Sequence, residues 1–255
     1  MHAPRSGELA EVLLVGAGGI GAPAALTLVE AGVRSFVVVD DDTVERSNLH
    51  RQILYGEADV GRPKLEAFRD AVLRRAPDAR VELVATRLVP ETAAELVTRA
   101  RVVIDAVDNF ASRFLAADAC WLAGRAAGAR GVPVVHAAAV RWVATVISSS
   151  PGGRPCYRCL FEDLPGGDAP DCATAGVVGP VCGVAGALAA ELALRILGRA
   201  PGEPYGQVYS YDGRSDRLRR VALRARKDCA LCGDEGRIER IDEALYLGPS
   251  CAEGA

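Results

Sequence analysis

The stretch from residue 11 to residue 64 constrains the fold of this 255-residue chain more than any other part of it. It begins with an apolar run, residues 11–15, that leads directly into the glycine-rich sequence GAGGIG at residues 16–21. Such a run is typical of a buried parallel strand that turns into a helix. Glycines at this turn let the backbone approach a phosphate at the helix N-terminus, where N–H groups and the helix dipole favour an anion. The candidate phosphate-binding positions are Gly16, Gly18, Gly19 and Gly21.

A second apolar run, residues 35–39, ends in three consecutive aspartates. The first of them, Asp40, follows Gly16 by about two dozen residues, the separation expected of a carboxylate that binds the ribose of a nucleotide. Asp42 is a second candidate ligand at the same strand end. These features alone fit any nucleotide-binding fold, including that of an NAD-dependent oxidoreductase.

Two cations and two amides follow the aspartates and distinguish between these possibilities. They are Asn48, Arg51, Gln52 and Lys64. Arginine and lysine together can neutralise a triphosphate and the pyrophosphate that leaves it. A dinucleotide enzyme has no need of a second polyphosphate clamp here, so the arrangement favours ATP. Without its neighbours, Lys64 would be interpreted as an exposed lysine in the first turn of a helix that ends near residue 76.

These motifs resemble those of the E1-like adenylating enzymes, the family of ThiF, MoeB and the ubiquitin-activating enzymes. The resemblance rests on GAGGIG at residues 16–21, VVDDDTVERSNLHRQ at 38–52 and VGRPK at 60–64, and it extends from residue 12 to residue 232. It implies a Rossmann-like α/β fold with a mostly parallel sheet, antiparallel C-terminal strands and a structural zinc site. One adenylation domain is expected over residues 1–255, with a nucleotide-binding half (1–150) and a half for zinc, crossover loop and carrier (151–255).

A further buried strand, residues 101–107, ends in Asp108 and Asn109, and Arg113 follows on the next helix; all three are candidates to bind the nucleotide. Because the carboxyl ends of parallel strands meet at one edge of a sheet, we expect Asp108 to lie near Gly16 and Asp40. A carboxylate at that edge can bind Mg²⁺ through oxygen. Asp108 could instead cap the following helix, and both interpretations can hold together.

The chain contains eight cysteines, and four of them form two CxxC pairs. A core-rich chain of this length without an export signal has no need of disulfides, so metal binding is the better interpretation. Two CxxC turns supply four thiolates, the ligand set of a structural zinc site, although two unrelated pairs of reduced thiols are the alternative. The resemblance supports zinc, because CYRCL and CALCG lie where the family's zinc cysteines lie. The expected ligands are Cys156, Cys159, Cys229 and Cys232.

The second half of the chain is expected to serve the protein substrate. Residues 161–175 have the composition of a crossing loop and contain Cys172. The resembled family has a cysteine in this loop that attacks the adenylate or joins the sulfur-transfer intermediate in some members and is bypassed in others. Residues 179–197 predict a helix in which Cys182 is a small buried hydrophobe. Residues 207–212 and 218–223 predict an antiparallel pair around a turn.

Composition excludes several classes of function. The net charge of −3 provides no electrostatic footprint for nucleic acid. No apolar run approaches the length of a membrane span and residues 1–8 carry no cleavable signal, so the chain is expected to be cytoplasmic. Many members of the resembled family begin with a helix whose arginine reaches the partner subunit's nucleotide. Here Arg5 is the one arginine before the first strand, and it is interpreted as a solvated terminal charge.

The resemblance implies an ATP-dependent adenylyltransferase that activates the C-terminal carboxylate of a small ubiquitin-like sulfur-carrier protein. The carboxylate attacks the α-phosphate, pyrophosphate leaves, and the acyl-adenylate goes on to sulfur transfer and a thiocarboxylate. No general base is needed, because the carboxylate is ionised at neutral pH. Arg51, Lys64 and Asp108 are expected to align the reactants and neutralise charge, and Cys172 to act after activation.

The implied partners are a carrier with a C-terminal Gly-Gly tail, a separate sulfur donor and a second copy of the chain in a homodimer. The dimer is also supported by apolar helix faces and few charges after residue 177. Three alternatives remain open. They are an E1-like enzyme that adenylates a peptide in natural-product biosynthesis, an NAD-dependent oxidoreductase, and a non-catalytic partner module with a vestigial nucleotide site.

Overall fold

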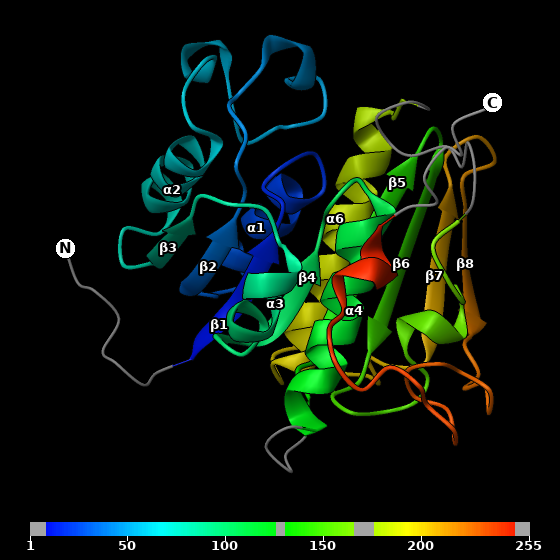
Figure 1. Ribbon diagram of the computed structural model, residues 1–255. Coiled ribbons are helices and arrows are strands. Elements are labelled where there is room, and N and C mark those ends of the chain that lie inside the picture. Colours follow the sequence, from blue (N-terminus) through cyan, green and yellow to red (C-terminus); the bar gives the residue numbers. More distant parts are fainter. Residues whose placement is uncertain (1–8, 126–130, 166–175, 248–255) are drawn as a thin grey trace, which may run out of the picture.

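The computed structural model describes residues 9–125, 131–165 and 176–247, and it is built around one eight-stranded sheet (Figure 1). The strand order is β3-β2-β1-β4-β5-β6-β7-β8. The strands are β1 (Ala10–Val15), β2 (Ser35–Val39), β3 (Arg80–Val84), β4 (Ala100–Asp105), β5 (Val134–Val140), β6 (Val143–Ser149), β7 (Gln207–Asp212) and β8 (Arg217–Ala222). Pairing is parallel from β3 to β5 and antiparallel from β5 to β8, which confirms the predicted fold class.

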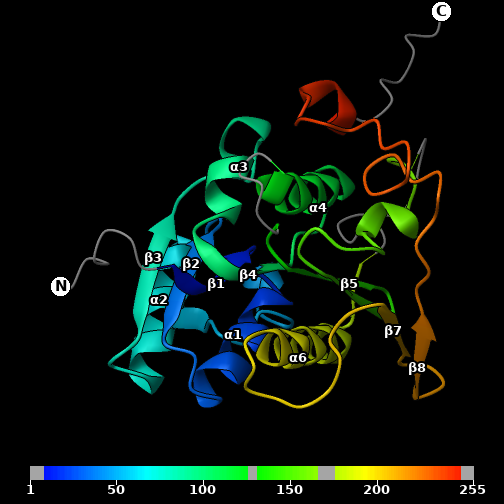
Figure 2. The same ribbon diagram turned by 90° about the horizontal axis from the view of Figure 1, so that it is seen from below.

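Helices cover both faces of the sheet (Figure 2). They are α1 (Gly21–Glu30), α2 (Lys64–Arg75), α3 (Pro90–Val97), α4 (Phe110–Arg125) and α6 (Gly179–Ile196). The two faces have separate cores: Leu14 of β1 packs with α1, α2 and α6, whereas its neighbour Leu13 packs with α3 and α4. Burial of both side chains explains why the central strands are apolar without a break.

The longest helix, α6, lies against α1, β5 and β6. Its backbone approaches α1 closely at Gly186, where a Cβ atom would lie 2.6 Å from the carbonyl oxygen of Ile20. By length and composition alone α6 could cross a membrane, so the expectation that no apolar run approaches such a length was wrong. In the fold, the buried face of α6 forms part of the hydrophobic core, as expected of a core helix.

Between β2 and α2 the chain makes an excursion through two short 3₁₀ helices, η1 (Arg46–Asn48) and η2 (Glu57–Asp59). Arg62 holds its end, with ion pairs to Asp59 at 2.7 Å and to Asp70 of α2 at 2.6 Å. The excursion starts at the carboxyl end of β2, and it places its own side chains beside the turns that follow β1 and β4. It therefore forms one wall of the candidate site.

Candidate active site

The loop after β1 requires glycine at two positions, Gly16 and Gly21, because a side chain at either one would collide with the backbone. Gly16 has φ +93°, and a Cβ atom on it would lie 2.9 Å from the carbonyl oxygen of Ala106. A Cβ on Gly21 would lie 2.0 Å from the carbonyl oxygen of Gly16. The loop thus passes close to the turn after β4 and leads directly into α1, whose first turn carries no acidic residue. This geometry leaves a helix N-terminus suited to an anion.

Asp40 is held by backbone and by a buried lysine. Its Oδ2 accepts the Ala17 N–H at 2.8 Å, and its Oδ1 accepts the Asp42 N–H at 2.9 Å. The Lys64 Nζ lies 3.3 Å from Asp40 Oδ1 and 2.8 Å from Asp42 Oδ2. Lys64 is 3% exposed and lines the cleft, so the alternative of an exposed first-turn lysine does not apply. Lysine and backbone together hold the Asp40 carboxylate in one orientation at the strand end.

The excursion supplies amide and guanidinium groups next to the glycine loop. Gln52 is 4% exposed, and its Oε1 has no hydrogen-bond partner among the described residues. A buried amide oxygen without a partner costs free energy, and a bound ligand or water can relieve that cost. Arg51 crosses the loop so closely that a Cβ on Gly19 would lie 3.2 Å from its Cγ. Asn48 lies on the same wall.

The residues after β4 lie as the strand-edge rule predicts, with one difference in their roles. Asp108 and Asn109 are exposed and line the same cleft as the glycine loop. The side chain that caps α4 is Asn109, whose Oδ1 accepts the Ser112 N–H at 2.9 Å, so Asp108 is not required as the cap. Arg113, predicted to bind the nucleotide, is 5% exposed and lies behind the turn, where it donates to the carbonyl oxygen of Val107.

Together these groups line a cleft of about 520 Å³ at the carboxyl ends of the parallel strands. From the predicted set the cleft contains Gly16, Gly18, Gly19, Asp40, Asp42, Asn48, Arg51, Gln52, Lys64, Asp108 and Asn109. Gly21 forms the start of α1, and Cys172 lies outside the described residues, as does Arg5. The glycine cradle and the two cations form a donor set that fits the phosphates of a nucleoside triphosphate. The Gln52 Oε1 is an acceptor, so its partner has to be an N–H or O–H group of a ligand or a water.

Several further side chains of this cleft were not predicted from the sequence, among them Arg87, Ser112 and Cys182. Arg87 forms an ion pair with Asp41 at 2.9 Å. It follows the carboxyl end of β3, so the rule that located Asp108 could also have found it. Cys182 is buried, as predicted, but its Sγ would lie 3.3 Å from a Cβ on Gly19. Nothing in the apolar sequence of α6 distinguishes such a residue from an ordinary core cysteine.

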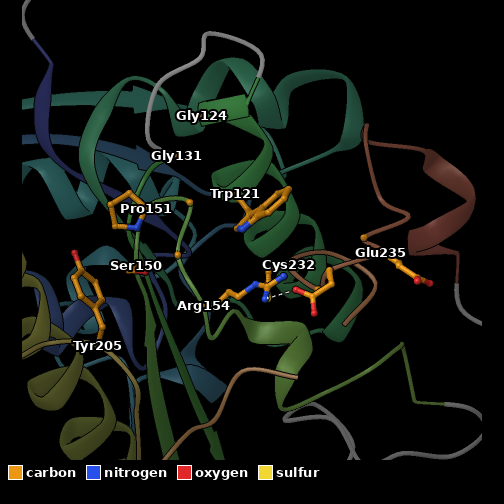
Figure 3. Close-up of a pocket in the computed structure, with 14 residues that line it drawn as sticks. Trp121, Gly124, Gly131, Ser150, Pro151, Arg154, Tyr205, Cys232 and Glu235 are labelled. Atoms are coloured by element: carbon orange, nitrogen blue, oxygen red, sulfur yellow. Dashed lines mark hydrogen bonds and ion pairs between the residues drawn. The ribbon is translucent and has the colours of Figure 1, made fainter. Parts of the chain in front are cut away.

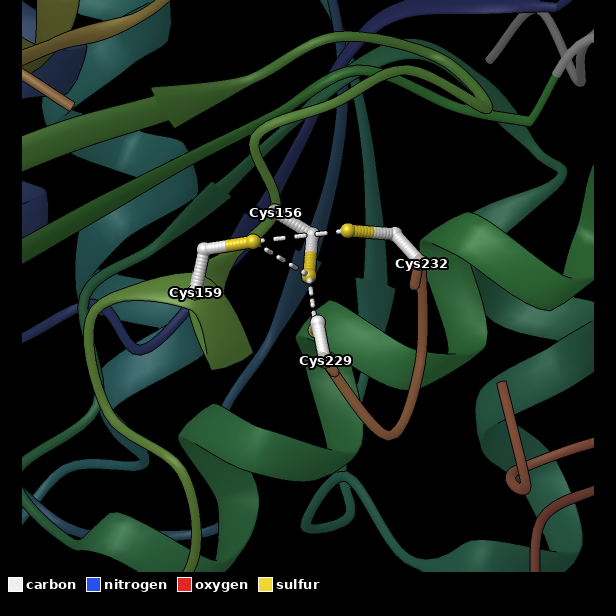
Figure 4. A group of neighbouring side chains, drawn as sticks. All are labelled: Cys156, Cys159, Cys229 and Cys232. Atoms are coloured by element: carbon white, nitrogen blue, oxygen red, sulfur yellow. Dashed lines mark hydrogen bonds between the residues drawn. The ribbon is translucent and has the colours of Figure 1, made fainter. Parts of the chain in front are cut away.

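A second centre lies where the two CxxC turns meet (Figure 4). All four sulfur atoms are buried and lie within 4.8 Å of one another, although the two pairs are far apart in sequence. The distance is 3.5 Å from Cys156 to Cys229 and 3.4 Å from Cys159 to Cys232. Four sulfurs bound to one zinc ion at 2.3 Å would be about 3.8 Å apart, so the cluster fits zinc. The hydrogen bond between Cys156 and Cys232 lowers the pKa of the Cys232 thiol to about 5 and raises the pKa of the Cys156 thiol. Zinc binding to all four sulfurs would therefore release thiol protons.

A larger hollow of about 900 Å³ lies next to Cys232, near the amino end of β5 (Figure 3). Six of its lining residues are glycines, and its charged groups include Arg154 and Asp234, which form an ion pair with each other at 2.8 Å. The smaller cleft, by contrast, combines a helix N-terminus with converging cations and carboxylates. Chemistry therefore assigns the candidate active site to the smaller cleft, despite the difference in volume.

Comparison with known proteins agrees with this geometry. The model of the ThiF family matches residues 8–232. A protein named SAMP-activating enzyme E1 from Haloferax volcanii is 40% identical over 242 residues, with 94% of this chain and 86% of that protein covered. The sulfur carrier protein ThiS adenylyltransferase of Escherichia coli is 39% identical over 224 residues, which cover 88% and 86%. The chain spans 53% of the pig adenylyltransferase and sulfurtransferase MOCS3, to which it is 41% identical.

Among solved structures, E. coli MccB with ATP has a TM-score of 0.73 at 23% identity, with 88% of this chain and 67% of that chain covered. A complex of the microcin C7 biosynthetic enzyme MccB with N-formylated MccA has a TM-score of 0.75 at 25% identity and the same coverage. These likenesses show a shared fold. Together with the family match over most of the chain and the relatives near 40% identity, they lead to one conclusion: the chain belongs to the ThiF family of E1-like adenylating proteins.

Proposed function

We propose that the protein is an ATP-dependent adenylyltransferase that activates the C-terminal carboxylate of a small ubiquitin-like sulfur-carrier protein. The observation that carries the proposal is the convergence of the glycine loop, Arg51, Lys64 and Asp108 on one cleft. The names of the relatives support the substrate class, because they describe SAMP-activating and ThiS-adenylating enzymes. MccB, which is named as a microcin C7 biosynthetic enzyme, is less similar in sequence, so the alternative in natural-product biosynthesis is the weaker one.

The proposed chemistry is an in-line displacement on the α-phosphate of ATP. The ionised carrier carboxylate forms the new oxygen–phosphorus bond, and the bond to the departing pyrophosphate breaks. Asp40 would bind the ribose, the start of α1 would face the phosphates, and Arg51 would neutralise charge on the leaving group. Lys64 is already paired with Asp40 and Asp42, so it would both orient these carboxylates and add positive charge to the cleft.

Magnesium is part of the proposal. The carboxylates of Asp40, Asp41 and Asp42 lie within 4.8 Å of one another, and Asp108 lines the same cleft. Carboxylate oxygens are ligands that Mg²⁺ accepts alongside substrate phosphates. Bound there, the ion would neutralise part of the triphosphate charge. We also propose one zinc ion on the cysteine cluster, with a structural role.

The proposed docking surface for the carrier is formed by β6, β7 and β8. It lies on the same face of the sheet as α4. Side chains alternate between the two faces of a strand, and Arg217, Arg219 and Val221 of β8 point to this face. Val143 of β6 points to the same face, because Asp212 of β7 pairs with both Val143 and Arg217. Val143 is 42% exposed and Val221 is 56% exposed. Exposed apolar groups among arginines suit a partner with an apolar patch and acidic groups around it.

The dimer and the cytoplasmic location remain proposals, as does the division into two halves at residue 150. The apolar face of α6, which supported the dimer, packs inside the chain against α1 and the sheet. Support for a dimer therefore comes from the family resemblance alone. Sedimentation of the purified chain over a range of concentrations tests it, and a monomer throughout would contradict it.

Exchange of labelled pyrophosphate into ATP tests the proposed function. The purified chain is assayed with a panel of sulfur-carrier proteins whose C-termini are free or blocked as amides. We expect exchange that depends on Mg²⁺ and on a free Gly-Gly carboxylate. Exchange with short peptides instead would favour the peptide alternative, and binding of NAD in place of ATP in a calorimeter would favour the oxidoreductase.

A further inference from the structure

Three buried polar side chains lie directly behind the cleft and form one group. They are Asp105, Arg113 and His136, which are 0%, 5% and 1% exposed. Asp105 is the last residue of β4, and the parallel register pairs it with His136 of β5. Buried charges are costly unless they are paired, so a group of this kind has to be satisfied internally.

The group holds the turn that carries Asp108. The His136 Nδ1 lies 2.7 Å from Asp105 Oδ2, and the Arg113 Nη1 lies 3.6 Å from the same oxygen. The other carboxylate oxygen of Asp105 accepts the Val107 N–H at 3.2 Å. Arg113 donates to the carbonyl oxygen of Val107. Both backbone polar groups of Val107 are therefore bound from behind, one residue before Asp108.

The hydrogen-bond chemistry assigns the proton between the imidazole and the carboxylate. Burial lowers the pKa of His136, and this outweighs the opposite effect of Asp105. Burial raises the pKa of Asp105, but Arg113 and the hydrogen bond with His136 outweigh it, so the pKa lies below its usual value. A neutral imidazole therefore donates from Nδ1 to a carboxylate.

The far side of the imidazole is fixed by packing. Its Nε2 is buried and has no hydrogen-bond partner among the described residues. The ring lies against Tyr157, with 4.5 Å between the ring centroids, and Tyr157 belongs to the turn between Cys156 and Cys159. This aromatic contact and the bond to Asp105 restrict rotation of His136 about both side-chain torsions.

We propose that His136 is a positioning residue for the nucleotide cleft, which acts by holding Asp105 so that Asp105 and Arg113 fix the turn that presents Asp108 to ATP. The inference rests on the proposed function only in that ATP is the ligand of the cleft. His136 touches no reactant itself. A residue that merely filled space in the core would affect folding stability without affecting the affinity for ATP.

Two substitutions separate volume from hydrogen bonding. His136→Leu keeps most of the volume and removes the donor, whereas His136→Asn loses volume and keeps an N–H donor near the position of Nδ1. Ile147→Ala is the matched control, because Ile147 lies opposite His136 on β6 and is equally buried. Each purified variant is titrated with ATP·Mg in a calorimeter at a temperature where all remain folded, and its melting temperature is measured separately.

We expect His136→Leu to bind ATP about tenfold more weakly, the effect of losing roughly one hydrogen bond. His136→Asn should stay within about threefold of the wild type, even if it melts at a lower temperature, because its donor remains. Ile147→Ala should lower the melting temperature with unchanged affinity. Wild-type affinity in His136→Leu would overturn the inference, and so would equal losses in His136→Leu and Ile147→Ala.

Nitrogen-15 NMR of the imidazole provides a readout that is independent of ATP. The chain has three histidines, so the His136→Asn spectrum assigns the His136 signals by difference. We expect a neutral ring with the proton on Nδ1 at pH 7, and a proton on Nε2 or on both nitrogens would overturn the inference. A wild-type chain that does not bind ATP would overturn the proposed function together with this inference. Normal binding by both the wild type and His136→Leu would overturn this inference alone.

Discussion

The nucleotide cleft and the cysteine cluster are assembled in opposite ways. The cleft collects short segments that each follow a parallel strand, so their positions are set by the strands themselves. The cluster joins two turns that are 73 residues apart, from Cys156 to Cys229 and from Cys159 to Cys232. The position of the cleft therefore follows from the sheet, whereas the cysteine cluster links two distant parts of the chain.

The difference also appears in what surrounds each site. Cleft residues such as Asp108 and Arg87 are exposed to solvent and available to a ligand. Next to the cysteines, Arg158 is 2% exposed and forms a 2.8 Å ion pair with Asp118, which also accepts the Tyr246 hydroxyl at 2.9 Å. The cleft is thus prepared for chemistry, while the cluster is enclosed by its own packing and suits a structural role.

The largest expected effect is the loss of stability when the cysteine cluster is broken. Cys229→Ser removes one zinc ligand, and the melting temperature should fall by about 10 °C or more, since structural zinc sites contribute directly to folding free energy. Cys120→Ala is the control, because Cys120 is a buried cysteine of α4 that belongs to a different apolar core from the four clustered cysteines. Calorimetry and metal analysis by mass spectrometry check both variants. Full zinc content in Cys229→Ser would show that the cluster is not the site.

The next largest effect is a loss of activity when cleft residues are replaced, with the cysteine cluster left intact. Arg51→Ala and Asp108→Ala should each slow ATP–pyrophosphate exchange by about tenfold or more, because each removes one preorganised contact to developing charge. Their zinc content and melting temperature should match those of the wild type. Arg46→Ala is the control, since Arg46 pairs with Glu57 on the same excursion and faces solvent. Wild-type exchange by both cleft variants would refute the site assignment.

A smaller effect is expected at the proposed docking surface. Arg219→Glu should raise the KM for the carrier by about fivefold at low salt and leave the KM for ATP unchanged, because charges at the rim of an interface mainly change the rate of association. Arg220→Glu is the matched control on the opposite face of β8, across from Tyr209. Steady-state exchange at several salt concentrations measures both. Equal effects of the two substitutions would argue against the assigned face.

Much of the cleft could be predicted because parallel strands place their carboxyl ends together. The glycine loop, Asp40 and Asp108 each follow an apolar run, and such runs are easy to find in a sequence. The two CxxC pairs could be found in the same way, and a shared ligand chemistry suggested that they meet. Their actual meeting required the structure, since spacing alone did not exclude two separate pairs.

The residues behind the cleft could not be predicted from the pattern. His136 is one polar residue in an apolar strand, and such a residue is ordinarily a satisfied member of the core. Arg113 resembled a ligand because it follows Asp108 on a helix, yet the helix turns its side chain inward to Asp105. Lys64 was predicted for the cleft from its neighbours in the sequence, but the sequence does not reveal that Asp40 and Asp42 enclose it. Pairing between buried charges depends on tertiary packing that periodicity does not encode.

The smallest effect on activation, none at all, is expected for Cys172, which lies outside the described residues and is therefore argued from sequence. Its loop precedes α6, which begins at Gly179, and a helix N-terminus nearby would favour a thiolate, whereas Asp168 and Asp171 would oppose it. If activation depends on the cleft alone, Cys172→Ala should keep full pyrophosphate exchange and lose any covalent bond between carrier and enzyme. Intact-mass spectrometry with ATP and carrier measures that bond as a reducible or hydroxylamine-sensitive adduct. Complete sulfur transfer by the alanine variant would show that Cys172 takes no part in the reaction.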